Sequence, residues 1–419
     1  MTDNPSNAGA ATSTGYQPAP WCGISRNALL ILLVVFIAGA SLRLFGLPHY
    51  KRGGYDEVLY STYVTTLDAY GLLNYPAMVR VYIEDQKTSP TTKLPPTRFL
   101  YIFMAYGWDR LFHDSELESL HAISCLFSIL VLPLAAVFAY RLGGERMAVG
   151  TLVLVTVSPM QIYVSRHALI DGFFAFWALL SLWLLWENLQ KPRSAAWLAC
   201  YTASLALMVI TKENAFFVFI AIAGILAVNR WTKFGIVNLP LTLCTLGGGA
   251  LGVAILSILS GGLDTCIETY LVLMKNASHF PYAIKTGDGP WYRYLYDMML
   301  MGPIVLMLAI GAAFRVTREK KDHLFLLAFI AFSYLVMCNV KYGMNLRYTS
   351  MWDMPMRYLA FWQLCAICDS FKTRRTLALI LCMAVLCGWE LRQYYIVFVE
   401  NNLYELITAA LTHALKIVK

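Results

Sequence analysis

The stretch formed by residues 27–47, NALLILLVVFIAGASLRLFGL, is the first long apolar run of the chain. A helix needs about 20 predominantly apolar residues to cross the ~30 Å hydrocarbon core of a bilayer, and this run is long enough. Arg26 stands directly before it. Because basic residues flank membrane spans on the cytoplasmic side, the simplest orientation places the N-terminus in the cytoplasm.

The composition of the whole chain is also that of a membrane protein. Of its 419 residues, 58% are hydrophobic and only 14% are charged, and the mean hydropathy is +0.57, unlike a soluble domain. The net charge of +8 comes from Lys and Arg in short clusters between apolar runs, as the positive-inside rule expects, so no nucleic-acid partner is predicted. The ten cysteines lie mostly inside apolar runs and predict neither a disulfide framework nor a zinc site.

The apolar runs predict an all-α integral membrane protein with about eleven spans. Residues 98–113 decide the count, because they are apolar on average but short and interrupted by Asp109 and Arg110. If this segment does not cross, the later basic clusters fall in the cytoplasm; if it crosses, they all fall outside. We therefore predict that it does not span, with the N-terminus inside and the C-terminus outside. The predicted spans are 27–47, 117–140, 147–164, 172–186, 195–210, 215–228, 234–259, 298–314, 324–340, 355–371 and 376–398.

The two ends of the chain differ from this central membrane domain, residues 26–399. Residues 1–25 are rich in Ser, Thr, Asn, Pro, Gly and Ala and lack the pattern of a cleavable signal, which predicts a disordered cytoplasmic tail. Residues 400–419 place Leu403, Leu406, Ile407 and Leu411 on one helical face. This pattern predicts an interfacial amphipathic helix.

The predicted topology gathers ionisable residues on the outer side of the membrane. Asp56 and Glu57 lie together in a polar segment, residues 48–97, whose length is typical of a functional loop. Ionisable groups at the ends of spans are costly unless they pair or line a wet cavity, so we predict an aqueous pocket at the outer face. The other candidate residues on that side are Lys93, Arg166, Asp171, Lys212, Arg347 and Tyr348.

Each cluster also has a plain structural interpretation. The two adjacent acids fit a solvated loop, and Lys212 fits a cation that snorkels at a helix end. Arg166 and Asp171 fit a salt bridge across a turn, and Arg347 fits an interfacial anchor. The presence of four such clusters on one face favours a functional site.

The order of the clusters resembles a known family, the protein O-mannosyltransferases of glycosyltransferase family 39 and the related lipid A aminoarabinose transferases, which share the GT-C fold. The resemblance covers roughly residues 27–230 well and residues 345–359 more loosely. The residues that carry it are Asp56 and Glu57, Lys93 before Pro95 and Pro96, the pattern Ser158, Pro159, Tyr163, Arg166 and Asp171, then Thr211 and Lys212, and finally Arg347 and Tyr348.

The resemblance implies a transfer reaction on the non-cytoplasmic face, with the active site at the first outer loop. A sugar, mannose or another hexose or pentose, would pass with inversion from a polyprenyl-phosphate donor to a hydroxyl of a protein, lipid or glycan acceptor. In such a displacement a carboxylate takes the acceptor proton, and cations stabilise the charge on the departing phosphate. We expect the host membrane, whose lipid surrounds the chain, to be the plasma (inner) membrane of a prokaryote.

The resemblance also implies roles for individual residues. Asp56 would be the general base, and Glu57 would orient this base or the sugar. Arg166 and Asp171 would surround the base and the sugar. The donor phosphate would be bound by Lys93, Arg347, Tyr348 and Lys212.

The chain departs from the family in three places. Residues 261–296 leave no room for the β-trefoil domain of eukaryotic members, and the C-terminal part is shorter than in the aminoarabinose transferases. One residue is inserted between Lys93 and the two prolines. The acceptor is not carried over from the resemblance.

Two alternatives and one cofactor question remain open at this level. A transporter or lipid flippase would also have an outward polar cavity, but such folds usually contain two related halves and interrupted helices near the midplane, and no internal repeat is visible. A catalytically inactive scaffold of the same fold is the second alternative, which the retained Asp56 opposes. Adjacent carboxylates can hold Mg²⁺ or Mn²⁺ beside a phosphate, whereas a general base needs no metal, so no metal ligand is assigned.

Overall fold

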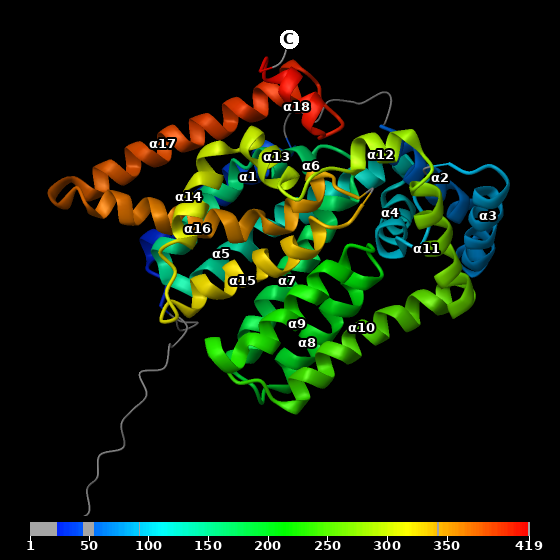
Figure 1. The fold of residues 1–419 in the computed structure, drawn as a ribbon, viewed down its shortest axis with the longest axis horizontal. Helices are drawn as coiled ribbons and strands as arrows, with labels where there is room; N and C mark the ends of the chain where they lie inside the picture. The colour runs from blue at the N-terminus through cyan, green and yellow to red at the C-terminus, as the bar shows by residue number, and fades with distance from the viewer. Residues whose placement is uncertain (1–22, 45–53, 92, 342, 418–419) are drawn as a thin grey trace, which may run out of the picture.

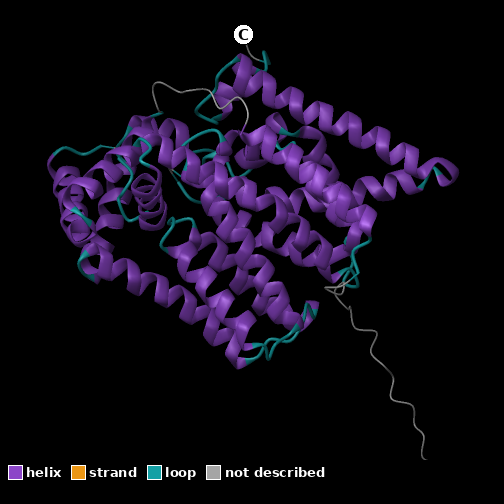
Figure 2. Ribbon diagram, turned by 180° about the vertical axis from the view of Figure 1, so that it is seen from behind, coloured by secondary structure: helices purple, strands orange, loops and turns teal. Residues whose placement is uncertain are grey.

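The computed structural model describes residues 23–44, 54–91, 93–341 and 343–417, and this part of the chain is built from helices without a strand (Figures 1 and 2). The prediction of an all-α protein is confirmed. Residues 1–22 of the predicted N-terminal tail lie outside the described residues. The elements in chain order are α1 (Arg26–Leu44), α2 (Tyr55–Tyr70), η1 (Leu72–Asn74), α3 (Tyr75–Thr88), α4 (Phe99–Phe112), α5 (Glu116–Thr156), α6 (Pro159–Ser165), α7 (Ile170–Gln190), α8 (Ala195–Val209), α9 (Ala215–Thr232), α10 (Leu239–Ser260), α11 (Leu263–Ala277), α12 (Pro281–Gly287), α13 (Arg293–Met301), α14 (Pro303–Ala313), α15 (Lys321–Met337), η2 (Leu346–Trp352), α16 (Asp353–Asp369), η3 (Lys372–Arg374), α17 (Arg375–Tyr394), η4 (Tyr395–Glu400) and α18 (Thr408–Ala414).

Within the described ranges, six helical segments are long and apolar enough to cross a membrane: α1, α5, α7, α9, α10 and the segment Lys372–Glu400, which contains α17. Helices α8 and α14 are apolar but shorter. The chain is an integral membrane protein. The count of eleven spans stays a prediction. That residues 98–113 do not span also stays a prediction; the 14 residues of α4 reach only about 21 Å as a helix.

Helix α5 consists of two limbs that lie against each other. Gly144 has φ 76° and ψ −168°, a conformation that costs a residue with a side chain more than it costs glycine. Arg43 of α1 donates from Nε to Ser128 Oγ at 2.9 Å and from Nη2 to the Val155 carbonyl at 3.3 Å. Because one side chain bonds both limbs, the chain must turn back at Gly144. This turn separates the predicted spans 117–140 and 147–164.

The segment 48–97, which the sequence suggested to be an outer loop, contains helices α2 and α3 in its described part. Helices α2 and α3 each bury two tyrosines, and Figure 1 shows these helices together with α4 and α11 at one side of the molecule. The hydroxyls of Tyr63 and Tyr82 donate to the carbonyls of Leu94 and Lys93 at 2.6 and 3.1 Å, and that of Tyr75 donates to the Pro96 carbonyl. These bonds fasten residues 93–96 against α2 and α3.

Two further segments differ from their predicted form. The predicted span 298–314 is divided into α13 and α14 at Gly302, because a residue before proline is pushed out of the helical region. In the described part of the predicted tail helix 400–419, the chain beyond η4 is helical only in α18, Thr408–Ala414. Asn402 has a positive φ of 46°, which interrupts the helix, and the predicted apolar face turns inward, since Leu406 and Leu411 are completely buried in the protein.

Candidate active site

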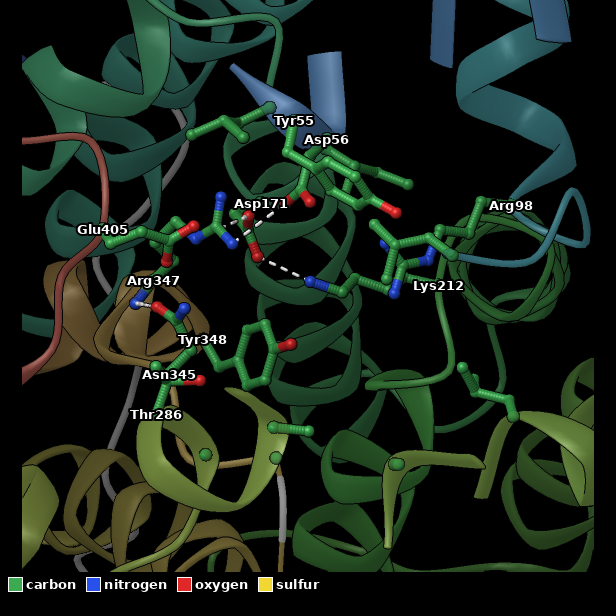
Figure 3. A pocket seen from close by; sticks show the side chains of 18 of the residues that line it. Tyr55, Asp56, Arg98, Asp171, Lys212, Thr286, Asn345, Arg347, Tyr348 and Glu405 are labelled. Carbon is green, nitrogen blue, oxygen red and sulfur yellow. Dashed lines mark hydrogen bonds and ion pairs between the residues drawn. The ribbon is translucent and has the colours of Figure 1, made fainter. Parts of the chain in front are cut away.

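A cavity of about 460 Å³ lies where the start of α2, the start of α7, the α8–α9 link, η2 and the C-terminal tail meet (Figure 3). This volume lies within the usual range of small-molecule sites. Six charged side chains line the cavity: Asp56, Arg98, Asp171, Lys212, Arg347 and Glu405. Five of the eight candidate residues from the sequence, Asp56, Asp171, Lys212, Arg347 and Tyr348, therefore share one cavity with residues that the sequence did not single out.

Four charged residues form a chain of alternating sign along this cavity. Arg347 Nη2 lies 3.0 Å from Asp56 Oδ2, and Arg347 Nε lies 3.9 Å from Asp171 Oδ2. The other oxygen of Asp171 accepts a hydrogen bond from Lys212 Nζ at 2.6 Å, and Lys212 Nζ also lies 4.1 Å from the centre of the Tyr348 ring. Figure 3 shows these side chains converging from four separate elements.

Burial makes the charges of Arg347, Asp171 and Lys212 dependent on their partners. Burial lowers the pKa of Lys212, and the carboxylate of Asp171 opposes that shift. Burial alone would also lower the pKa of Arg347, but Asp56 and Asp171 raise it well above its usual value. Removing one member of such a buried pair typically costs about 3–5 kcal/mol, because the other charge is left uncompensated.

Arg347 keeps hydrogen-bonding capacity in reserve. Its Nε and Nη1 are buried and have no hydrogen-bond partner among the described residues. A buried guanidinium with unused N–H groups is unusual, because nearly all buried polar groups in folded proteins are satisfied. Guanidinium groups match the oxygens of phosphate well, so the free N–H groups of Arg347 fit an anionic ligand in the cavity.

Glu57 faces away from the cavity and fixes the first turn of α2. Its carboxylate accepts hydrogen bonds from the backbone N–H groups of Gly54 at 2.5 Å and Ala168 at 2.7 Å, and it lies 3.2 Å from His167 Nδ1 and 3.5 Å from His121 Nε2. Burial would raise the pKa of Glu57, but the hydrogen bonds from His121, His167 and Gly54 hold it well below its usual value. Glu57 therefore ties α2 to the α6–α7 link and positions its neighbour Asp56. Since Asp56 and Glu57 face different partners, the two carboxylates do not converge on one cation.

Besides Glu57, two further predicted site residues do not line the cavity. Lys93 Nζ pairs with Asp85 Oδ2 at 2.7 Å in a neighbouring groove between α2 and α3. Arg166 donates from Nη2 to the Leu42 carbonyl at 2.8 Å and lies over the ring of Tyr394. Lys93 is held by the α2–α3 unit, and Arg166 connects the α6–α7 link with α1 and α17.

Arg98, which was not among the residues predicted from the sequence, lines the cavity from the start of α4. Its Nε donates to Glu213 Oε2 at 3.1 Å, and its Nη1 donates to the hydroxyl of Tyr60. A signal was present, because Arg98 follows the two prolines and Glu213 follows Lys212 directly. The tail residue Glu405 gave no such signal, since the tail pattern suggested a helix at the membrane surface.

Comparisons with known proteins relate this geometry to a fold. The model of a family described as dolichyl-phosphate-mannose-protein mannosyltransferase matches residues 100–263, which include Asp171 and Lys212 but not Asp56 or Arg347. Among solved structures, ArnT from Cupriavidus metallidurans in the apo state is similar with a TM-score of 0.55 and 16% identity, over 88% of this chain and 65% of that chain. ArnT bound to undecaprenyl phosphate is similar with a TM-score of 0.52 and 15% identity, over 93% of this chain and 74% of that chain.

An archaeal enzyme shows the same likeness. The oligosaccharyltransferase of Archaeoglobus fulgidus, in a complex with Zn and sulfate, has a TM-score of 0.56 and 12% identity, over 87% of this chain and 53% of that chain. No curated protein matches the chain. The chain thus spans 65% and 53% of the lengths of apo ArnT and the archaeal enzyme. These matches confirm the resemblance drawn from the sequence: the chain has the fold of the GT-C glycosyltransferases, and its residues 100–263 match the protein mannosyltransferase family.

Proposed function

We propose that the chain is a glycosyltransferase that uses a polyprenyl-phosphate sugar as donor. It transfers mannose or another hexose or pentose, with inversion, to a hydroxyl of a protein, lipid or glycan on the non-cytoplasmic face. The observation that carries the proposal is the series Asp56, Arg347, Asp171 and Lys212 facing one cavity, in which Asp56 is partly exposed and the other three residues are buried. A carboxylate beside two cations is the arrangement that this displacement needs.

The reaction follows from the positions of these groups. Asp56 accepts the proton of the acceptor hydroxyl while the hydroxyl oxygen forms a bond to the anomeric carbon of the sugar. The bond from that carbon to the phosphate oxygen breaks, and the phosphate leaves with the electron pair. The unused N–H groups of Arg347 and the ammonium of Lys212 stabilise the charge that develops on the phosphate. Phosphate leaves without a proton, so no acid is required.

The remaining candidates act through these groups. Asp171 holds Arg347 and Lys212 in place by pairing with both. Tyr348 lies under Lys212 and limits the positions of its ammonium. Glu57 and Arg166 are positioning residues, because their contacts fix the segments around the cavity and not its contents. In this mechanism cationic side chains of the protein stabilise the negative charge of the phosphate, and no step is assigned to a divalent cation.

The site lies at one end of the long helices and the basic links lie at the other. Helix α7 begins at the cavity, next to Asp171, and its 21 residues carry the chain about 31 Å to the link that contains Lys191 and Arg193. If basic links face the cytoplasm, the cavity opens on the opposite side. That the membrane is the plasma (inner) membrane of a prokaryote stays a prediction.

The proposal is tested with the purified full-length chain in detergent. A polyprenyl-phosphate donor labelled in its sugar is incubated with acceptor hydroxyls, and both free polyprenyl phosphate and labelled product are measured. We expect the two to appear together in the parent and to be lost in Asp56→Asn. If no donor is consumed while the reconstituted protein moves a solute or lipid across vesicles, the chain is a transporter and the proposal is wrong.

A further inference from the structure

One wall of the cavity comes from the C-terminal tail, in the segment of residues 401–407 between η4 and α18. Glu405 lines the cavity, and the ring of the preceding Tyr404 lies 5.9 Å from the guanidinium carbon of Arg347. Figure 3 shows Glu405 beside Arg347. Lys212 lies on the other side of Asp171 in this view. The tail therefore reaches the same group of charges that we assign to catalysis.

The tail is held firmly in this position. The hydroxyl of Tyr163 donates to the Tyr404 carbonyl at 2.6 Å, Leu406 is completely buried, and Thr408 Oγ1 donates to Asp297 Oδ1 at 2.7 Å. At Gly54 an added Cβ would lie 2.1 Å from Tyr404 Cζ. With glycine at position 54, the ring of Tyr404 packs directly against the turn that carries Asp56, and a larger residue there would have to displace this ring.

Glu405 is the charge in the cavity that is left over when the other charges are paired. Arg98 pairs with Glu213, Lys212 with Asp171 and Arg347 with Asp56. Among the described residues, Glu405 has no hydrogen bond or ion pair. Hydrogen bonds to charged groups are stronger than hydrogen bonds between neutral groups. A carboxylate that is held at a cavity wall without a donor from the protein is therefore suited to accept a hydrogen bond from a ligand.

The charge of Glu405 decides which part of the donor it meets. A carboxylate repels a phosphate, so the phosphate belongs with Arg347 and Lys212. The sugar ring carries O–H donors, in some sugars also an ammonium, and a carboxylate accepts hydrogen bonds from either. We propose that Glu405 is a specificity-determining residue that accepts hydrogen bonds from hydroxyl or ammonium groups of the transferred sugar. This inference rests on the proposed function.

The test compares Glu405→Gln and Glu405→Ala with the parent on polyprenyl-phosphate mannose, its glucose and aminoarabinose analogues, and the monodeoxy analogues of whichever sugar the parent transfers best. Glu400→Gln is the matched control, because Glu400 belongs to the same tail but is half exposed and lies 3.9 Å from Lys416. We expect kcat/KM to fall about 10- to 100-fold for both Glu405 variants, the usual effect of losing a charged hydrogen bond, and to stay within about twofold for the control. Binding of sugar-free polyprenyl phosphate should not change in any variant.

The deoxy donors separate sugar recognition from a structural role. For the analogue that lacks the group bound by Glu405, the parent and Glu405→Ala should have equal kcat/KM, because the contact is already absent. A penalty that is greatest on the aminoarabinose donor identifies an ammonium as the bound group. If the Glu405 variants match the parent, or lose the same factor on every analogue, Glu405 does not read the sugar while the proposed function stands. If the parent transfers no sugar from any donor, the proposed function fails and this inference fails with it.

Discussion

Asp56 and Arg347 form the ion pair on which the proposed chemistry depends, at a distance of 3.0 Å. Replacing Asp56 by Asn keeps the size of the side chain and removes its ability to accept a proton. We expect the variant to fold and bind donor, and sugar transfer to fall by the ~10²–10⁴ attributed to general base catalysis. Transfer assays on protein that is shown to be folded and donor-bound check this, and a near-parental rate would remove Asp56 from its assigned role.

Arg347 and Lys93 were both assigned to the donor phosphate, and the structure separates them. Arg347 is buried in the cavity, whereas Lys93 forms a half-exposed pair with Asp85. We expect Arg347→Ala to lose about 2–4 kcal/mol of transition-state stabilisation and Lys93→Ala to change little, since exposed pairs contribute ~0–1 kcal/mol. Turnover measured at saturating and subsaturating donor distinguishes the two; equal effects would contradict the assignment of the phosphate to Arg347.

Glu57 stabilises the first turn of α2, a role that its position next to Asp56 in the sequence did not suggest. The lowered pKa of Glu57 means that its ionised carboxylate is stabilised more in the folded protein than in the unfolded chain. This stabilisation is complete above the unfolded pKa of about 4.3 and is lost as the pH falls toward the folded value. Glu57→Gln should therefore lower Tm at neutral pH, and its Tm should fall less than that of the parent between about pH 5 and about pH 3. Parallel Tm curves for the two proteins would show that Glu57 contributes no such linkage.

At the scale of the element, the contact between the first turn of α2 and the tail is the feature on which the site depends. A Cβ at Gly54 would meet the ring of Tyr404, whereas a Cβ at Gly107 in α4 would meet nothing within 4 Å. We expect Gly54→Ala to displace the tail and reduce both Tm and transfer. Gly107→Ala, the matched control, should leave transfer intact and stabilise α4 slightly. A Gly54→Ala variant with parental Tm and transfer would show that this contact is dispensable.

The elements that the sequence did not predict are those determined by tertiary contacts. Helices α2 and α3 were missed because polar and aromatic residues alternate in them without a clear apolar stripe, and their tyrosines pack against residues 93–96 instead of lipid. The tail was misjudged because Leu406 and Leu411 fit an interfacial face as well as a buried one. In contrast, the long apolar runs depend only on length and composition, and α7 and α10 lie where they were expected.

The candidate site also combines features that the local sequence predicts with features that depend on tertiary contacts. Asp56, Asp171, Lys212 and Arg347 were singled out as candidates because ionisable residues beside apolar runs stand out in a sequence. Which of them share a cavity depends on how segments far apart in the chain pack. Lys93 and Arg166 have the same character in the sequence, yet the structure directs one into a neighbouring groove and the other toward α1 and α17.

At the scale of the whole molecule, bonds between the basic links place these links on one side. Helix α1 begins beside the turn of α5, and this turn also contacts the C-terminal ends of α7 and α16. The α9–α10 link bonds to the α7–α8 link, and the α14–α15 link bonds to α16. The contacts are Ser25 Oγ to Glu145 at 2.8 Å, Arg141 to Glu187 at 2.6 Å, Arg146 to Asp369 at 3.4 Å, Asn238 to the Pro192 carbonyl at 2.7 Å and Arg315 to Gln363 at 2.7 Å. The ion-pair series of the cavity lies at the opposite end of α7.

This arrangement makes the predicted topology testable with single cysteines. Arg146 is half exposed at the turn of α5, and Leu73 is almost fully exposed in η1 at the opposite side. An impermeant thiol reagent added to intact cells should label Leu73→Cys and leave Arg146→Cys at the background of the parent, which has cysteines of its own. Once the membrane is permeabilised, both variants should be labelled. Labelling of Arg146→Cys in intact cells would place the basic links outside and contradict the predicted topology. If Leu73→Cys is labelled as well, residues 98–113 would have to span, because one additional crossing between the two cysteines reverses every later link.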